Sequence, residues 1–182
     1  MAKDIISTLP DAILCHILSF LETKHAVATS ILSKRWKHLW HFVPTLCFNT
    51  QVTDQKSNYD FNDFVYSVLV SRDATLPIKS SHLDVTYDKF LDEYFHHPVN
   101  GITKWVNFMV QCRVEYLNLH VDSVGIPKLP ATILTCTTLV VLKLFCFDTE
   151  EGSSSVLPSL KTLHLEIMWF PKLRDFMMFL IG

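Results

Sequence analysis

Apolar residues recur at helical spacing in the first forty residues of the chain. One stripe of a predicted amphipathic helix is formed by Ile13, Leu14, Ile17, Leu18 and Leu21. Pro10 suits the first turn of this helix, because that turn does not need the N–H that proline lacks. Thr23 is expected to cap a second helix over 24–30, and Ser33 a third over 34–41. Helices this short cannot bury their apolar sides alone, so they are expected to pack together or against a partner.

The third predicted helix places Trp36, Leu39 and Trp40 on one side, with basic residues around the rest. A buried aromatic face with a solvated basic rim explains this pattern. The alternative is a helix-turn-helix-like unit whose third helix reads DNA. The chain has 16 basic and 18 acidic side chains and a formal net charge of -2, which gives no general attraction to polyanions. Nucleic-acid binding is therefore the weaker interpretation, and neither nucleic acid nor membrane is an expected partner.

A polar stretch without periodicity, residues 49–57, marks a boundary in the chain. Apolar residues at helical spacing then predict a helix over 60–71. Beyond it, apolar and polar residues alternate in strand-like runs at 82–86, 114–119, 139–144 and 160–165. The aromatic segment Trp105–Met109 lies between the first two runs and is expected to form an intervening helix.

The strand-like runs repeat at a regular distance. Their Leu-x-Leu cores align at Leu117, Leu142 and Leu163, which are 25 and 21 residues apart and match the roughly 20–29 residues of a leucine-rich repeat. The 34 residues from Leu83 to Leu117 are too many for one repeat, so the register of the first run stays open. One strand cannot bury its own leucines. The repeats therefore predict stacked units, with a parallel sheet and one shared core.

Polar residues lie between the paired leucines of these runs. Because side chains alternate across a strand, Asn118, Lys143 and His164 are expected on the open face of the sheet. They are the candidate substrate-binding residues. Ordinary solvated positions are the alternative interpretation, since single polar residues on a sheet face need no function.

The N-terminal pattern closely resembles the plant F-box motif over roughly residues 4–48. The resemblance rests on the runs Asp4–Asp11, Ile13-Leu14, Ile17–Leu21, Thr23-Lys24, Ala26-Val27, Thr29-Ser30, Leu32–Lys37, Leu39-Trp40 and Val43-Pro44. It is similar to the subfamily in which an F-box precedes leucine-rich repeats and often an FBD domain. The chain reaches Gly182 directly after an apolar run, without room for an FBD domain. A truncated, non-functional family member is therefore a further alternative.

The resemblance implies a three-helix module that docks on a Skp-family adaptor, which links it to the cullin and RING subunits of an SCF-type ubiquitin ligase. It also implies that the repeats recognise an unknown protein substrate. The implied adaptor-binding residues are Leu9, Pro10, Ile13, Leu14, Ile17, Leu18, Val27, Leu32, Trp36 and Leu39. The sequence does not separate those that face the adaptor from those that close the module's own core.

The expected fold class is α+β, with a three-helix F-box followed by a leucine-rich-repeat α/β solenoid. We expect the F-box over 1–48, a linker and connecting helix over 49–79, and incomplete leucine-rich repeats over 80–182. The same interpretation predicts a substrate-recognition protein and not an enzyme.

The residues that carry chemistry are too scattered for a catalytic or metal site. No phosphate-binding loop or nucleophile elbow is formed by Gly101, Gly125, Gly152 and Gly182. Metal-ligand residue types occur at His38 with His41, and at His96-His97 near Asp92 and Glu93, but no second pair completes a ligand set. We interpret the group Asp88, Asp92 and Glu93 as solvated acidic residues and not as a catalytic carboxylate pair. No catalytic residue, cofactor or metal is expected.

Five cysteines without a CxxC pair suit thiols that are kept reduced in the cytosol or nucleus. No apolar run reaches the roughly 18 residues that a membrane helix requires. The expected localisation is therefore cytoplasmic, nuclear or both.

Overall fold

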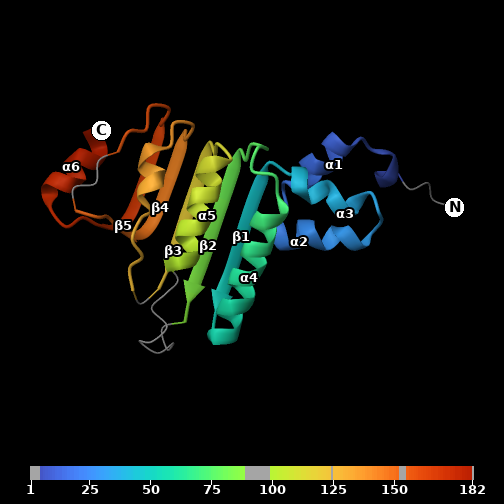
Figure 1. The fold of residues 1–182 in the computed structure, drawn as a ribbon, viewed down its shortest axis with the longest axis horizontal. Coiled ribbons are helices and arrows are strands. Elements are labelled where there is room, and N and C mark those ends of the chain that lie inside the picture. The colour runs from blue at the N-terminus through green and yellow to red at the C-terminus, as the bar shows by residue number, and fades with distance from the viewer. Residues whose placement is uncertain (1–4, 89–98, 124, 152–154, 182) are drawn as a thin grey trace.

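The computed structural model describes residues 5–88, 99–123, 125–151 and 155–181. A helical N-terminal region, residues 5–44, is followed by a five-stranded parallel sheet (Figure 1). In the N-terminal region, α-helices and 3-10 helices (η) follow in the order η1 (Ile6–Thr8), α1 (Asp11–Leu18), α2 (Thr23–Ala28), η2 (Thr29–Ile31), α3 (Trp36–Leu39) and η3 (Trp40–Phe42).

These helices differ in detail from the sequence expectation. Pro10 precedes α1 in an extended conformation, and Asp11 complements the positive end of the helix dipole. Thr23 is the first residue of α2 and not its cap, because its hydroxyl accepts a hydrogen bond of 2.8 Å from the backbone N–H of Cys47. The third helix was expected over 34–41, but α3 has only four residues and tightens into η3.

The sheet has the order β1-β2-β3-β4-β5, and every neighbouring pair is parallel. Its strands are β1 (Thr45–Val52), β2 (Ser80–Tyr87), β3 (Tyr116–Asp122), β4 (Val141–Asp148) and β5 (Thr162–Trp169). The helices that accompany them are α4 (Gln55–Ser71), α5 (Val99–Gln111), η5 (Ala131–Thr135) and α6 (Leu173–Ile181). The expected helix around Trp105–Met109 is therefore correct, and it is part of α5.

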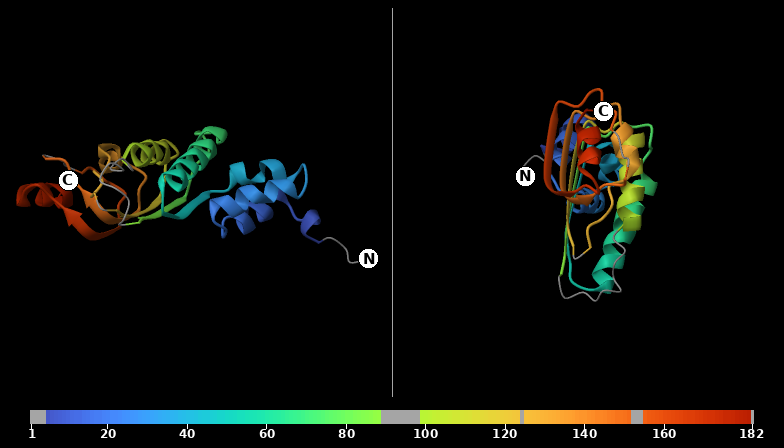
Figure 2. Two further views of the ribbon diagram at one scale, coloured as in Figure 1. Left: turned by 90° about the horizontal axis from the view of Figure 1, so that it is seen from below. Right: turned by 90° about the vertical axis from the view of Figure 1, so that its left-hand side faces the viewer.

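The helices pack against only one face of the sheet. Figure 2 shows α4 and α5 along this face, while no described helix covers the opposite one. The N-terminal helical region lies beyond β1, so the molecule is elongated and its two ends lie far apart (Figure 1). The described elements therefore leave the other face of the sheet for solvent or a partner.

The leucines of the strands align in rows that cross the sheet. Leu117 pairs with Leu142, and Leu142 pairs with Leu163, as the sequence predicted. Leu117 and Leu142 have no exposed area, and Leu163 packs against the same core. The sequence left the register of the first strand-like run open. In the structure Leu83 pairs with Leu119, and the residue that pairs with Leu117 is Ser81.

Each strand after the first begins with the same backbone arrangement. The N–H groups of Lys79 and Ser80 both donate to the carbonyl oxygen of Pro44. The same arrangement recurs at the next three strands, where the acceptors are the carbonyl oxygens of Lys79, Glu115 and Val140. The four junctions therefore have one geometry, although the segments between the strands differ in length.

The expected boundary at residues 49–57 needs a correction. Residues 49–52 are the second half of β1, and α4 already begins at Gln55 instead of at residue 60. The side chain of Asp54 accepts from the N–H of Ser57, and the hydroxyl of Ser57 accepts from the N–H of Asp54. This capping box starts α4 inside the stretch that looked unstructured.

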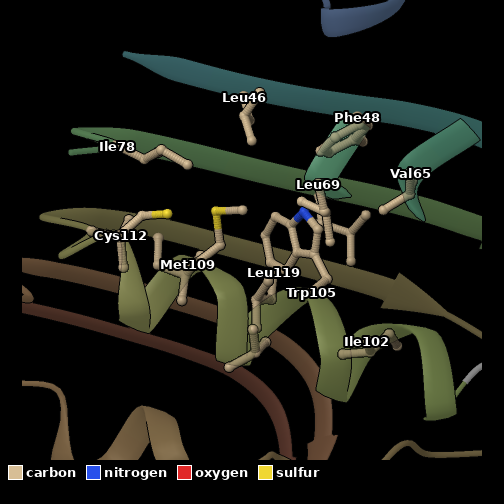
Figure 3. Close-up of a cluster of buried hydrophobic side chains, with 14 of the residues drawn as sticks. Leu46, Phe48, Val65, Leu69, Ile78, Ile102, Trp105, Met109, Cys112 and Leu119 are labelled. Carbon is tan, nitrogen blue, oxygen red and sulfur yellow. The ribbon is translucent and has the colours of Figure 1, made fainter. Parts of the chain in front are cut away.

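One continuous core joins the two parts of the molecule. It runs from α1 through the covered face of the sheet to β4 and α6. Its middle is filled by large side chains from β1, α4 and α5, with Trp105 between Phe48 and Met109 (Figure 3). Burial on this scale is the main force that stabilises the fold.

Candidate functional site

The N-terminal helical region exposes an unusual amount of apolar surface. Solvent-exposed large apolar side chains in this region are Ile5, Ile6, Ile13, Ile17, Phe20, Leu21, Ile31, Leu32 and Phe42. Exposed apolar patches mark interaction sites on soluble proteins. We call the part formed by Ile13, Ile17, Phe20, Ile31 and Leu32 the N-terminal apolar surface.

The structure separates the ten expected adaptor-binding residues into two sets. Four of them are buried in the protein's own core, namely Leu14, Leu18, Trp36 and Leu39. Leu14, for example, is 0% exposed and therefore closes the module's own core, a distinction that the sequence left open. Leu9 and Val27 are half-buried and pack against the core. The residues that remain exposed are Pro10, Ile13, Ile17 and Leu32.

The division follows from the geometry of α1. Side chains three to four residues apart share one side of a helix. Leu14 and Leu18 form the buried side, whereas Ile13 and Ile17 are 46% and 43% exposed on the adjoining side. The core therefore buries only part of the apolar stripe predicted from the sequence. Ile13 and Ile17, on the outer side of α1, remain exposed to solvent.

Arg35 fixes the segment that leads into α1. Its guanidinium group donates to Asp11 Oδ1 at 2.6 and 2.8 Å and also to the carbonyl oxygen of Leu9. The ion pair is partly exposed, so it contributes little stability by itself. Its effect is to hold the Leu9-Pro10 turn against the start of α3.

Two exposed residues at this surface were not among the expected anchors. Phe20 follows α1, and Ile31, at 88% exposure, lies in η2. The sequence did carry a signal for Ile31, since it precedes Leu32 in a short apolar pair outside any helical stripe. The signal for Phe20 was weaker, because Phe20 follows directly on a stripe that the core explains.

The three candidate substrate-binding residues lie in one row across the sheet. Asn118 pairs with Lys143, Lys143 pairs with His164, and His82 extends the row onto β2. Asn118 and Lys143 are half-buried and His164 is exposed. The structure brings the three together on the face that no described helix covers, and whether they bind a substrate stays a prediction.

Aromatic and basic side chains lie close together around Tyr116 on this face. Its ring centroid is 4.9 Å from that of His82 and 5.6 Å from Nζ of Lys143. Nε2 of His82 also lies 3.0 Å from the hydroxyl of Ser80. Burial, with a smaller contribution from Lys143, lowers the pKa of His82 below its usual range. The neutral imidazole is therefore favoured next to the lysine.

A second histidine extends this group along the strands. Nδ1 of His120 lies 3.0 Å from Oδ1 of Asp84, and its ring meets that of Phe145 edge-on at 4.1 Å between centroids. Together with Tyr116, Lys143 and their neighbours, these residues form a surface of rings and hydrogen-bonding groups that is typical of protein interfaces. We call the residues His82, Asp84, Tyr116, Asn118, His120, Lys143, Phe145 and His164 the open sheet surface.

The other candidate chemistries find no support in the described part of the chain. The four residues of α3 are too few for a DNA-recognition helix, and two of them, Trp36 and Leu39, are buried. No cluster of three or more potential metal ligands occurs among the described residues. His96, His97, Asp92 and Glu93 lie outside the described residues. Within the described segments, no helix has the length and hydropathy to cross a membrane.

The five cysteines are all free thiols. Cys112, Cys136 and Cys146 are buried, and Cys15 and Cys47 are half-buried. Burial raises the pKa of the Cys15, Cys47, Cys112 and Cys146 thiols, which keeps them protonated and poorly reactive.

Comparison with known proteins gives this geometry a family context. Residues 6–47 match the F-box domain. An F-box/FBD/LRR-repeat protein of Arabidopsis thaliana is 38% identical over 172 residues, which cover 92% of this chain and 36% of the relative. An F-box/LRR-repeat protein of the same plant is 36% identical over 175 residues, which cover 93% of this chain and 36% of the relative. An FBD-associated F-box protein of the plant is 36% identical over 167 residues, which cover 90% of this chain and 40% of the relative.

This chain thus spans 36–40% of the length of these three relatives. No solved structure matches it. The match at residues 6–47 includes α1, α2 and α3 and the whole N-terminal apolar surface. The chain therefore belongs to the plant F-box proteins, with its F-box domain at residues 6–47.

Proposed function

We propose that this protein is a substrate-recognition adaptor of an SCF-type ubiquitin ligase. Its F-box docks on a Skp-family adaptor, and through it on cullin and RING subunits, while its sheet binds the protein to be ubiquitinated. The observation that carries the proposal is the coincidence of two features. The residues that match the F-box domain are also those that expose the N-terminal apolar surface.

The apolar surface is suited to a protein partner. Ile13 and Ile17 project from α1, and Ile31 and Leu32 project from the turn after α2. An amphipathic helix that presents such residues binds in an apolar groove of its partner. Burying several of them stabilises a complex by several kcal/mol, at roughly 25 cal/mol for each Å² of apolar surface removed from water.

The repeat character of the sheet supports the second half of the proposal. The row of Leu117, Leu142 and Leu163 and the recurring backbone junctions favour a leucine-rich-repeat solenoid, in which stacked strands share one core. The open sheet surface then faces outward as the substrate platform, with Asn118, Lys143 and His164 among its contacts. The proposed function is binding and not catalysis, so no residue is assigned a catalytic role.

Affinity capture of the tagged full chain from plant cell extract, followed by mass spectrometry, tests this function. We expect a Skp-family protein and a cullin to be recovered together, and treatment with a proteasome inhibitor to enrich the substrate. A chain that recovers neither, but binds DNA with a steep dependence on salt, would instead support the nucleic-acid alternative. A chain that recovers neither and binds no DNA would support the non-functional alternative.

A further inference from the structure

A cavity of about 670 Å³ lies between α4 and α5, above β2. Its volume falls within the roughly 300–1,000 Å³ of pockets that bind small molecules. It lies on the helical side of the sheet, away from both the N-terminal apolar surface and the open sheet surface. Neither part of the proposed function accounts for it.

The deep walls of the cavity are apolar. They are formed by Val65 and Leu69 of α4, Leu83 and Val85 of β2, and Ile102 of α5, all of which are buried. The mouth carries polar and aromatic side chains, with Tyr59 and Tyr66 exposed beside it. An apolar interior with a few polar groups is the usual composition of a ligand site.

One buried hydrogen-bond donor in the wall has no acceptor. Trp105 is 1% exposed, and its Nε1 has no hydrogen-bond partner in the structure. The indole nitrogen is directed from α5 toward Leu69 and Phe48 (Figure 3), and Leu69 lines the cavity together with Trp105. A buried N–H that is left unpaired costs about 1–3 kcal/mol, so its position calls for an explanation.

A trapped water explains this donor poorly. A buried water needs about two to four polar partners, and the side chains of the buried lining residues Val65, Leu69 and Ile102 offer none. A larger molecule that fills the apolar cavity needs only one acceptor at this point. Its other atoms gain from the removal of apolar surface from water.

We propose that the cavity binds a neutral, largely apolar small molecule whose carbonyl oxygen accepts a hydrogen bond from Nε1 of Trp105. The ligand is neutral because none of the described residues in the deep walls is cationic, and a buried carboxylate without a cation is costly. Lys104, which also lines the cavity, is exposed, so its charge lies at the mouth. The phenol of Tyr87, another lining residue, has its pKa raised to about 12 by burial, in keeping with a poorly hydrated wall.

The test uses the purified full chain and prodan, a neutral naphthalene fluorophore with a single ketone oxygen whose emission shifts to the blue in apolar sites. We expect saturable binding of one prodan per chain. Trp105→Phe keeps an aromatic ring in place but removes the donor, so it should weaken prodan binding roughly tenfold. Trp169→Phe is the matched control, because Trp169 is exposed on β5 and does not line the cavity. It should leave the affinity unchanged.

Two further measurements keep the test decisive if Trp105→Phe does not fold. A naphthalene analogue that lacks the ketone should bind the unaltered protein roughly tenfold more weakly than prodan. Ile102→Phe, which fills the cavity, should abolish binding while circular dichroism shows an intact fold. The proposal is overturned if the unaltered protein does not bind prodan saturably, or if the affinity is the same with and without the ketone or the indole N–H.

Discussion

The guanidinium group of Arg72 donates a hydrogen bond of 3.0 Å to the carbonyl oxygen of Trp40. A second one, of 2.9 Å, reaches the carbonyl oxygen of Val43. Arg72 follows α4 directly, whereas Trp40 and Val43 end the F-box region, so this side chain ties the two parts of the molecule together. Only 6% of Arg72 is exposed, and burial lowers its pKa without removing its charge.

Arg72→Met should therefore destabilise the junction between the F-box and the sheet. It removes the guanidinium donor of the Val43 carbonyl oxygen and one of two donors of the Trp40 carbonyl oxygen, which still accepts from the N–H of Val43. A hydrogen bond from a charged group contributes about 1.5–3 kcal/mol and the Trp40 oxygen keeps a partner, so we expect a loss of roughly 2–4 kcal/mol. Arg72→Lys should restore only part of it, because an ammonium group lacks the planar fork that reaches both oxygens. Urea denaturation monitored by tryptophan fluorescence measures the change. Arg174→Met, at an exposed position in α6, is the control, and an equal effect of both substitutions would refute the role of Arg72.

Trp36→Ala should destabilise the F-box by about 3–5 kcal/mol, the range for removing a large buried aromatic side chain. Lys37→Ala, next to it on the exposed side of α3, should change the stability by less than about 0.5 kcal/mol. Thermal unfolding followed by circular dichroism compares the two variants. If Trp36 were a surface contact to nucleic acid, both variants would melt like the unaltered protein.

The stability of the protein should fall as the pH drops below about 6.5, the usual pKa of histidine. The pKa values of His82 and His41 are both lowered in the folded protein, chiefly by burial. Below their unfolded pKa, the unfolded chain therefore binds more protons than the folded one, and each proton bound favours unfolding. Urea midpoints measured from pH 7.5 to pH 5 should decrease through this window. His82→Asn should flatten the decrease, whereas an unchanged slope would contradict the burial of a neutral imidazole beside Lys143.

The parallel sheet was predictable from the sequence because its signal is periodic. Leu117, Leu142 and Leu163 repeat at nearly constant distances, and this spacing alone places them in register. The strand β1 was hidden, although Leu46, Phe48 and Val52 are spaced for one face of a strand. The F-box resemblance ended near Phe48, so the predicted boundary placed the first half of β1 in the F-box and the second half in the linker.

The sequence could give the candidate docking residues only as a set, without separating exposed from buried members. Leu14 and Ile13 are adjacent members of one apolar stripe, and only the packing of α1 on its neighbours decides which is buried. The role of Arg72 was out of reach for a different reason. Its partners are backbone carbonyl groups about thirty residues earlier in the chain, and such contacts leave no pattern in the sequence.

The central claim is that the outer side of α1 docks on a Skp-family adaptor, and calorimetric titration of the full chain with such an adaptor tests it most directly. Ile13→Ala together with Ile17→Ala removes two half-exposed anchors at about 1 kcal/mol each, so the adaptor should bind roughly 30-fold more weakly. Val70→Ala, at an exposed apolar position on α4 outside the F-box, is the control and should bind like the unaltered protein. Circular dichroism should show intact helices in both variants. An unaltered chain that does not bind the adaptor, or a double variant that binds with undiminished affinity, would contradict the account.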